Sequence, residues 1–228
     1  MDLPDNLSNS YEYAKKLFTD FGRLVILIIL DLIPLVNWIV AGYAARVLKE
    51  SPGADAPPKL EDYGRMFVDG AKIFFASLIY MLIPLILIAA GVGSFIAGLV
   101  MTGGADFMKG FTPAQMFVLG GTGLALVLIG VVLAFLMLII LAAGIAHMIK
   151  TGKFGKAFAF GEIFRIVGKV GWLKYLAWVI LVAIISAIIG AVVGSIPYVG
   201  WVISAIIGPP VVVFFFRSLG LLYSEGVQ

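Results

Sequence analysis

The residues best suited to chemistry interrupt an apolar stretch near the N-terminus, DLIPLVNWIV at residues 31–40. An ionisable side chain inside a membrane segment is costly and normally faces a polar partner or cavity. Asp31 is such a group, Pro34 lacks a backbone N–H and frees a carbonyl, and Asn37 adds an amide. These three residues predict an intramembrane polar site for an ion or a proton. Two alternatives remain open: a turn in which Asp31 and Asn37 satisfy their own backbone, or an Asp31 that lies near the membrane interface.

Two further ionisable residues lie at the ends of apolar segments. His147 precedes Lys150 and is typical of an interfacial residue, with pH sensing as the alternative. Arg217 lies near the end of the last apolar segment, where its long side chain can reach lipid phosphates. Pairing of Arg217 with Asp31 is the other possibility.

Motifs for catalysis or metal binding are missing from the sequence. There is no cysteine and one histidine, which excludes disulfides, thiolate chemistry and His-rich or Cys-based metal sites. The glycines of GGTG at 120–123 have no preceding strand and no following Lys-Ser/Thr, so they do not predict a nucleotide-binding loop. We expect no enzyme activity, no catalytic residue, no metal and no cofactor.

A series of small residues at four-residue spacing indicates helix packing. Ser186, Gly190 and Gly194 form this series and would let another helix approach closely. The partner is a helix of the same chain, which we favour, or another copy.

The elements that must position these residues are membrane helices. The chain has 228 residues, of which 62% are hydrophobic and 13% charged, against about 25% charged in ordinary globular domains. Its N-terminus has several acids and no small-residue cleavage site, so it does not resemble a signal peptide. We predict an all-α, polytopic membrane helical bundle forming a single membrane domain over 1–228. Four segments reach the length of about 20 apolar residues that a bilayer requires: 73–100, 114–147, 173–194 and 200–222.

The distribution of Lys and Arg predicts the orientation of these spans in the cell membrane. The connections 46–72 and 147–174 are rich in both residues and are expected to be cytoplasmic, as is the C-terminus. The basic residues are not gathered into one domain, which argues against nucleic acid and for anionic lipid headgroups. The candidate lipid contacts are Lys150, Lys153, Lys156, Arg165 and Lys169.

Residues 22–48 form either a fifth span or a re-entrant hairpin. Each arm beside Pro34 has about 12 apolar residues, or about 18 Å of helix, which crosses half a bilayer. A weak internal repeat favours the hairpin, because IPLVNWIV at 33–40 matches IPYVGWVI at 196–203, which must be a turn between two spans.

Three segments, 11–21, 60–72 and 154–172, show helical amphipathic spacing. They predict interfacial helices or, alternatively, the cytoplasmic ends of long spans. Their apolar stripes are Tyr11, Ala14, Phe18 and Phe21; Tyr63, Met66, Phe67 and Gly70; and Phe160, Ile163, Phe164 and Val167. Between the first two segments, ESPGADAPPKL is a stiff Pro-rich linker.

The stretches AGYAARV and DYGRMFVDGAKIFFASLIYMLIP, separated by the Pro-rich linker, resemble an uncharacterised family of archaeal and bacterial polytopic membrane proteins, known as a domain of unknown function. The residues that carry the resemblance are Gly42, Tyr43, Arg46, Pro57, Asp62, Phe67, Asp69, Gly70, Lys72, Tyr80 and Pro84. The resemblance implies a multi-span membrane fold and a prokaryotic source, and it supplies no activity.

Two functions follow from these patterns. The leading hypothesis is a permeation or transport pathway for a small solute or ion, formed by one copy or by an oligomer. It rests on Asp31 in a broken membrane segment and on the helix breaks predicted at Pro34, Pro84, Pro197 and Pro209–Pro210. The alternative is a lipid-interacting, membrane-organising scaffold or an accessory subunit of a membrane complex. In that case the amphipathic elements and the hairpin wedge into the cytoplasmic leaflet.

Overall fold

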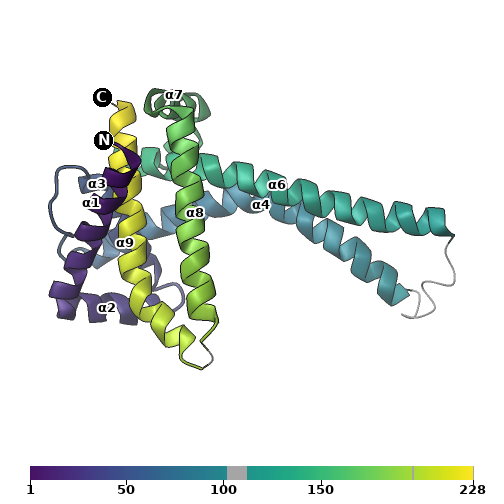
Figure 1. Cartoon of the computed structure of the whole chain (residues 1–228), viewed down its shortest axis with the longest axis horizontal. Helices are drawn as coiled ribbons and strands as arrows, with labels where there is room; N and C mark the ends of the chain where they lie inside the picture. The colour runs from purple at the N-terminus through teal and green to yellow at the C-terminus, as the bar shows by residue number, and fades with distance from the viewer. Residues whose placement is uncertain (102–111, 197, 228) are drawn as a thin grey trace. The chain divides into compact units, whose positions relative to one another are not determined.

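The computed structural model describes residues 1–101, 112–196 and 198–227, and every regular element in these ranges is helical. The predicted all-α class is confirmed. In chain order the elements are α1 (Leu3–Lys15), η1 (Lys16–Thr19), α2 (Phe21–Asp31), α3 (Trp38–Glu50), α4 (Tyr63–Met101), α6 (Pro113–Thr151), η3 (Phe154–Phe158), α7 (Phe160–Val170), α8 (Trp172–Gly194) and α9 (Gly200–Val227) (Figure 1).

Within the described residues, four helices are long and apolar enough to cross a membrane, as predicted. They are α4, α6, α8 and α9, whose candidate spans are Tyr63–Ser94, Gly121–Thr151, Trp172–Gly194 and Gly200–Val227. Helix α6 begins at Pro113, a residue whose fixed φ suits a first helical turn. The fold is that of a multi-pass membrane protein.

The chain forms two compact units. Unit 1 comprises Met1–Ala76 and Leu141–Gln228, and unit 2 comprises Ser77–Ile140. Helices α4 and α6 run through both units, so the single membrane domain expected from the sequence stays a prediction.

Helix α9 is the centre of unit 1. Helices α1, α2, α3, α7 and α8 all pack against it, and Figure 1 shows α1 and α8 beside it. Polar contacts fix this arrangement: the Asn6 side-chain amide of α1 donates to the Ser218 carbonyl at 3.2 Å, and the Trp178 indole of α8 donates to the Ser218 hydroxyl at 2.7 Å. The apolar core joins α1, η1, α2, α3, α4 and α9 through Tyr13, Ala14, Leu17, Leu27, Val40, Tyr43, Val47, Met66 and Val213.

Unit 2 includes the C-terminal part of α4 and the N-terminal part of α6, which approach each other through small residues. A Cβ added at Gly91 of α4 would lie 2.6 Å from the Gly123 carbonyl oxygen of α6, so only glycine permits this approach. Helix α4 continues through Pro84, and the predicted break there is wrong. Neighbouring helical turns retain their own hydrogen bonds when one N–H is lost, and spans tolerate proline for this reason.

The other predicted proline breaks have different outcomes. Helix α9 continues through Pro209 and Pro210, both of which are buried, so no break occurs there. Pro197 lies outside the described residues. The break at Pro34 is present, because α2 ends at Asp31 and α3 begins only at Trp38.

Residues 22–48 therefore form two short helices rather than one span. Arg23, at the start of α2, donates to the carbonyl oxygens of Pro57 and Pro58, which follow α3. The start of α2 thus lies against the linker that follows α3. Neither helix alone is long enough to cross a bilayer, which favours the hairpin over a fifth span.

The two copies of the I-P-x-V-x-W motif share one turn conformation. The residue after the proline has a positive φ in both, +67° at Leu35 and +64° at Tyr198. The amides of Asn37 and Gly200 each donate to the carbonyl oxygen four residues earlier, at 3.0 and 3.1 Å. The repeat therefore encodes a reversal of the chain in both places.

Most of the predicted apolar stripe of segment 11–21 is exposed, as a helix whose apolar side faces lipid would have it, and the interfacial position stays a prediction. Tyr11, Phe18 and Phe21 are 60%, 52% and 73% exposed, whereas Tyr13 and Leu17 are buried. In a membrane protein an apolar stripe faces either lipid or the protein interior, so the stripe alone does not identify the packed side.

The other two amphipathic segments differ from each other. Residues 63–72 are the first turns of α4 and continue directly into its span, which matches the alternative of a long helix end. Residues 154–172 contain a separate element, η3 followed by α7, which packs against α9 through Ile163, Ile166 and Val167.

Candidate functional site

A close crossing of α3 and α4 forms the framework of the site. A Cβ added at Gly42 would lie 1.7 Å from the Met66 carbonyl oxygen, and one at Gly70 would lie 1.8 Å from the Trp38 carbonyl oxygen. The Trp38 ring packs against Phe67, with ring centroids 5.3 Å apart. Glycine at both positions therefore lets the two backbones touch.

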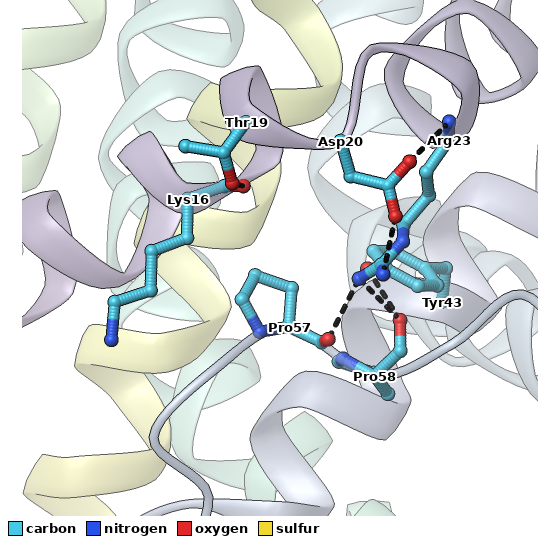
Figure 2. A network of polar contacts seen from close by, with 7 residues as sticks. All are labelled: Lys16, Thr19, Asp20, Arg23, Tyr43, Pro57 and Pro58. Atoms are coloured by element: carbon cyan, nitrogen blue, oxygen red, sulfur yellow. Dashed lines mark hydrogen bonds and ion pairs between the residues drawn. The ribbon is translucent and has the colours of Figure 1, made fainter.

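The Pro-rich linker, residues 51–59, is clamped against this framework (Figure 2). The Arg23 guanidinium donates to the carbonyls of Pro57 at 2.7 Å and Pro58 at 3.1 Å, and the Tyr43 hydroxyl donates to the Pro58 carbonyl at 2.9 Å. Asp20 accepts from the backbone amide and the guanidinium of Arg23 at 3.1 and 2.6 Å. These two bonds, the backbone one foremost, hold the pKa of Asp20 below its ordinary value.

More basic side chains donate to the same linker. Lys16, whose carbonyl accepts from the Thr19 hydroxyl, reaches the Asp55 carbonyl at 2.6 Å. Others donate as follows: Arg46 to the Lys59 carbonyl at 3.3 Å, Lys150 to the Ser51 carbonyl, and Arg217 to the Pro52 carbonyl at 3.2 Å. The linker is thus held by basic side chains from α2, α3, α6, α9 and η1, all of which belong to unit 1.

A charged cleft of about 550 Å³ lies between α3, the start of α4 and the end of α6. Its charged lining consists of Arg46, Lys49, Glu50, Asp62, Arg65, Asp69 and Lys72. Two ion pairs lie within it, Lys72–Asp69 at 2.7 Å and Arg46–Asp62 at 3.9 Å. Lys49, Glu50 and Arg65 have no ion pair among the described residues, so they can contact a charged ligand.

Arg217 is a structural residue of the core and does not extend to the surface as expected. It is 3% exposed, and its guanidinium lies 4.5 Å from the centroid of the Tyr13 ring. It donates to the Asn9 side-chain oxygen at 3.2 Å and to the Ser51 hydroxyl at 3.1 Å. Asp31 lies instead beside Gly208, nine residues earlier in α9, or about 13 Å along the helix, so the two do not pair.

His147 is also buried rather than interfacial. Its Nε2 lies 2.8 Å from a Glu162 carboxylate oxygen of α7, and its Nδ1 lies 2.7 Å from the Tyr223 hydroxyl of α9. A neutral ring donates from Nε2 and accepts at Nδ1, which satisfies both nitrogens. Hydrogen bonds from Lys156 and then His147 lower the pKa of Glu162. The three side chains join α6 and α9 to the amphipathic α7.

The predicted intramembrane site is only partly assembled. Asp31 is half-buried at the end of α2, whereas Pro34 and Asn37 are exposed in the turn. The Asn37 side chain does not cap α3, and no hydrogen bond joins it to Asp31. Asp31 lies close to Gly208 of α9, where an added Cβ would lie 3.1 Å from Oδ2 of Asp31.

The predicted lipid contacts fall into two groups. Lys150 donates to linker carbonyls and Lys156 pairs with Glu162, so both ammonium groups are used inside the chain. Lys153, Arg165 and Lys169 are exposed on η3 and α7 or just before them.

The predicted helix-packing face of α8 is open. Ser186, Gly190 and Gly194 are exposed, and a Cβ added at either glycine would have no neighbour within 4 Å. No helix of the described residues packs closely at these two glycines, and the packing partner stays a prediction.

Sequence reasoning missed the cleft, although its signal was available. Arg65, Asp69 and Lys72 are three or four residues apart and so share one face of a helix. Lys49 and Glu50 end the preceding helix. The sequence did not show that the hairpin and the linker bring the end of α3 next to this face of α4.

The comparisons with known proteins give a family and no activity. The model of a family described as "Protein of unknown function (DUF4013)" matches residues 26–198. No curated protein and no solved structure matches the chain. The matched region contains most of the hairpin, the linker and all of the cleft.

Proposed function

The chain belongs to the DUF4013 family of proteins of unknown function, as the resemblance in its sequence predicted, and from its geometry we propose a non-enzymatic, lipid-interacting protein that organises the cell membrane. The observation that supports this proposal is the pair of short helices α2 and α3, which are joined by an apolar, exposed turn. The hairpin acts as a wedge in one leaflet, and the C-terminus and both basic connections are cytoplasmic.

The size of the hairpin suits one leaflet. Helices α2 and α3 have 11 and 13 residues. They are therefore about 16 and 20 Å long, against a hydrocarbon core of about 30 Å. Leu32, Ile33 and Leu35 in the turn are 52%, 45% and 62% exposed, so burial in lipid is what covers them.

Basic side chains supply the second part of the proposal. Lys153, Arg165 and Lys169 are exposed on one amphipathic element, which packs on α9 by its opposite, apolar face. Each such residue near an anionic membrane contributes about 1 kcal/mol of attraction. Together with the hairpin they would hold unit 1 at the cytoplasmic leaflet.

Vesicle shape tests the wedge. Protein reconstituted into vesicles containing anionic lipid should tubulate them without releasing an entrapped dye. The triple variant Leu32→Ser, Ile33→Ser, Leu35→Ser should lose tubulation. A matched control, Ile180→Ser, Ile184→Ser, Ile188→Ser, removes residues of α8 that are 51%, 49% and 57% exposed and should retain it. Equal tubulation by the turn variant and the wild type would refute the wedge.

A permeation pathway is the second candidate, and the position of Asp31 favours it. Asp31 lies against Gly208, next to Pro209 and Pro210, which cannot donate to the carbonyls four residues earlier in α9. A carboxylate beside freed carbonyls is the kind of environment that binds a small cation or a proton in transporters. Ion or proton flux into liposomes should fall in the Asp31→Asn variant. It should not fall in the control Asp55→Asn, which changes an exposed residue of the linker. Unchanged flux in both variants would exclude a role for Asp31 in permeation.

A further inference from the structure

We propose that the charged cleft binds a phosphodiester that carries a primary amine, the chemistry of an ethanolamine phospholipid headgroup. The proposal deepens the lipid interaction described above and rests on it for the membrane as the source of the ligand. Its own basis is separate from the hairpin: the set of charges in the cleft and the depth at which the cleft opens.

The charges left over in the cleft are two cations and one carboxylate. Arg46 and Lys72 are already paired with Asp62 and Asp69. Lys49 and Arg65 can therefore donate to phosphate oxygens, which accept charge-assisted hydrogen bonds well. Glu50, adjacent to Lys49, can accept from an ammonium group. A headgroup with a phosphate and no amine would pair with the two cations, but its negative phosphate would repel the Glu50 carboxylate.

The cleft is also built to keep its shape without the ligand. Its floor is the close α3–α4 crossing, where Gly42 contacts the Met66 backbone. The Lys150 ammonium, which would compete for a phosphate, donates instead to the carbonyls of Lys49 and Ser51. Lys49 and Glu50 therefore stand at the end of a helix whose last turn is fixed by these bonds.

Aromatic residues mark the depth of the cleft. Phe67, Phe74 and Phe75 of α4 are 37%, 45% and 47% exposed, and all three pack around the Trp38 ring. Exposed aromatic side chains concentrate at membrane–water interfaces, where lipid headgroups lie. In α4 the charged residues of the cleft, Arg65, Asp69 and Lys72, end where the apolar span begins, so the cleft opens at headgroup level.

The amine-bearing phosphodiester could come from a lipid or from a free compound, and binding measurements separate these sources. Purified full-length protein in detergent micelles is titrated with phosphatidylethanolamine, with phosphatidylglycerol and with soluble glycerophosphoethanolamine, and binding is followed by native mass spectrometry and thermal shift. We expect phosphatidylethanolamine to bind at least about tenfold more tightly than phosphatidylglycerol, because only its amine can donate a charge-assisted hydrogen bond to Glu50.

Variants assign the roles. Glu50→Gln should abolish the preference for the amine while phosphatidylglycerol still binds. Lys49→Gln with Arg65→Gln should weaken both lipids about tenfold or more, and Lys49→Arg with Arg65→Lys should restore them. The control Lys153→Gln with Arg165→Gln should change neither, although it should weaken attachment of the protein to anionic vesicles. Lipid binding by these variants therefore tests the cleft, and the vesicle assays test the membrane-organising proposal, so a failure of one proposal can be told from a failure of the other.

Two outcomes would overturn the proposal: equal affinity of the wild type for the two lipids, or a preference that survives Glu50→Gln. Competition by glycerophosphoethanolamine would support the free compound as the ligand. Preference for the lipid without such competition would support the headgroup in the membrane.

Discussion

The α3–α4 crossing yields the sharpest test of the structure, the substitution Gly42→Ala. The added Cβ would lie 1.7 Å from the Met66 carbonyl oxygen, whereas real Cβ atoms essentially never approach another atom within 3.0 Å. Overpacking a core costs about 1–3 kcal/mol. Here the clashing atoms belong to the Met66 backbone and cannot rotate away as a side chain could, so we take the upper end of this range, about 3 kcal/mol. Replacement of a helical glycine by alanine returns about 1 kcal/mol. The net loss is about 2 kcal/mol.

The assay is the apparent Tm of the detergent-solubilised protein, followed by size-exclusion chromatography after heating. A loss of about 2 kcal/mol corresponds to a fall of about 4–8 °C for a chain of this size. Gly64→Ala is the control on α4, because a Cβ there meets nothing within 4 Å, and its Tm should not fall. Gly70→Ala should resemble Gly42→Ala. The double variant should lose less than the sum, because one separation of the helices relieves both clashes. If Gly42→Ala behaves like Gly64→Ala, the close crossing is refuted.

The remaining predictions concern the repeated turn and α7. Leu35→Gly and Tyr198→Gly should each stabilise the protein by about 1 kcal/mol in chemical unfolding, because a left-handed backbone is unfavourable for a residue with a Cβ; a loss of stability in both would show that φ is not positive there. Hydrogen bonds from Lys156 and His147 lower the pKa of Glu162 from its ordinary 4.5, so their contribution is present above that pH and is lost as the pH falls through the lowered value. Glu162→Gln should therefore be less stable than the wild type at pH 7 and lose less on acidification; parallel curves would contradict this.

Features that depend on local length and composition were predictable from the sequence. The four spans follow from runs of apolar residues, and the turn at 32–37 follows from Pro34 and its repeat near Trp201. The repeat was informative because the same short motif imposes the same positive φ in two settings, at Leu35 and Tyr198. Proline alone was a poor guide. Pro84 and Pro209 lie inside continuous helices, where tertiary packing outweighs the loss of one hydrogen bond.

The hydrogen-bond partners of the basic side chains were not predictable, because they depend on which segments, distant in sequence, pack together. Arg217 contacts residues of the linker and α1 that are more than 160 positions away in sequence. A charged residue near the end of a span looks the same in sequence whether it reaches lipid phosphates or a buried carbonyl. His147 illustrates the same limit, since its two partners come from α7 and α9.

The linker, residues 51–59, contacts many of the basic side chains that matter for orientation and for ligand binding. Counting Lys and Arg in loops predicts which connections share the cytoplasmic side. In the structure the side chains of Lys16, Arg23, Arg46, Lys150 and Arg217 converge on carbonyl oxygens of residues 51–59. The same convergence removes five cations from the set available to lipids, because carbonyl oxygens already accept from them. The charges that remain for a ligand are those that the linker leaves free, and in the cleft these are Lys49 and Arg65 opposed by Glu50. Under the binding proposal made above, the chain would discriminate among headgroups through these three side chains rather than through its net charge of +3.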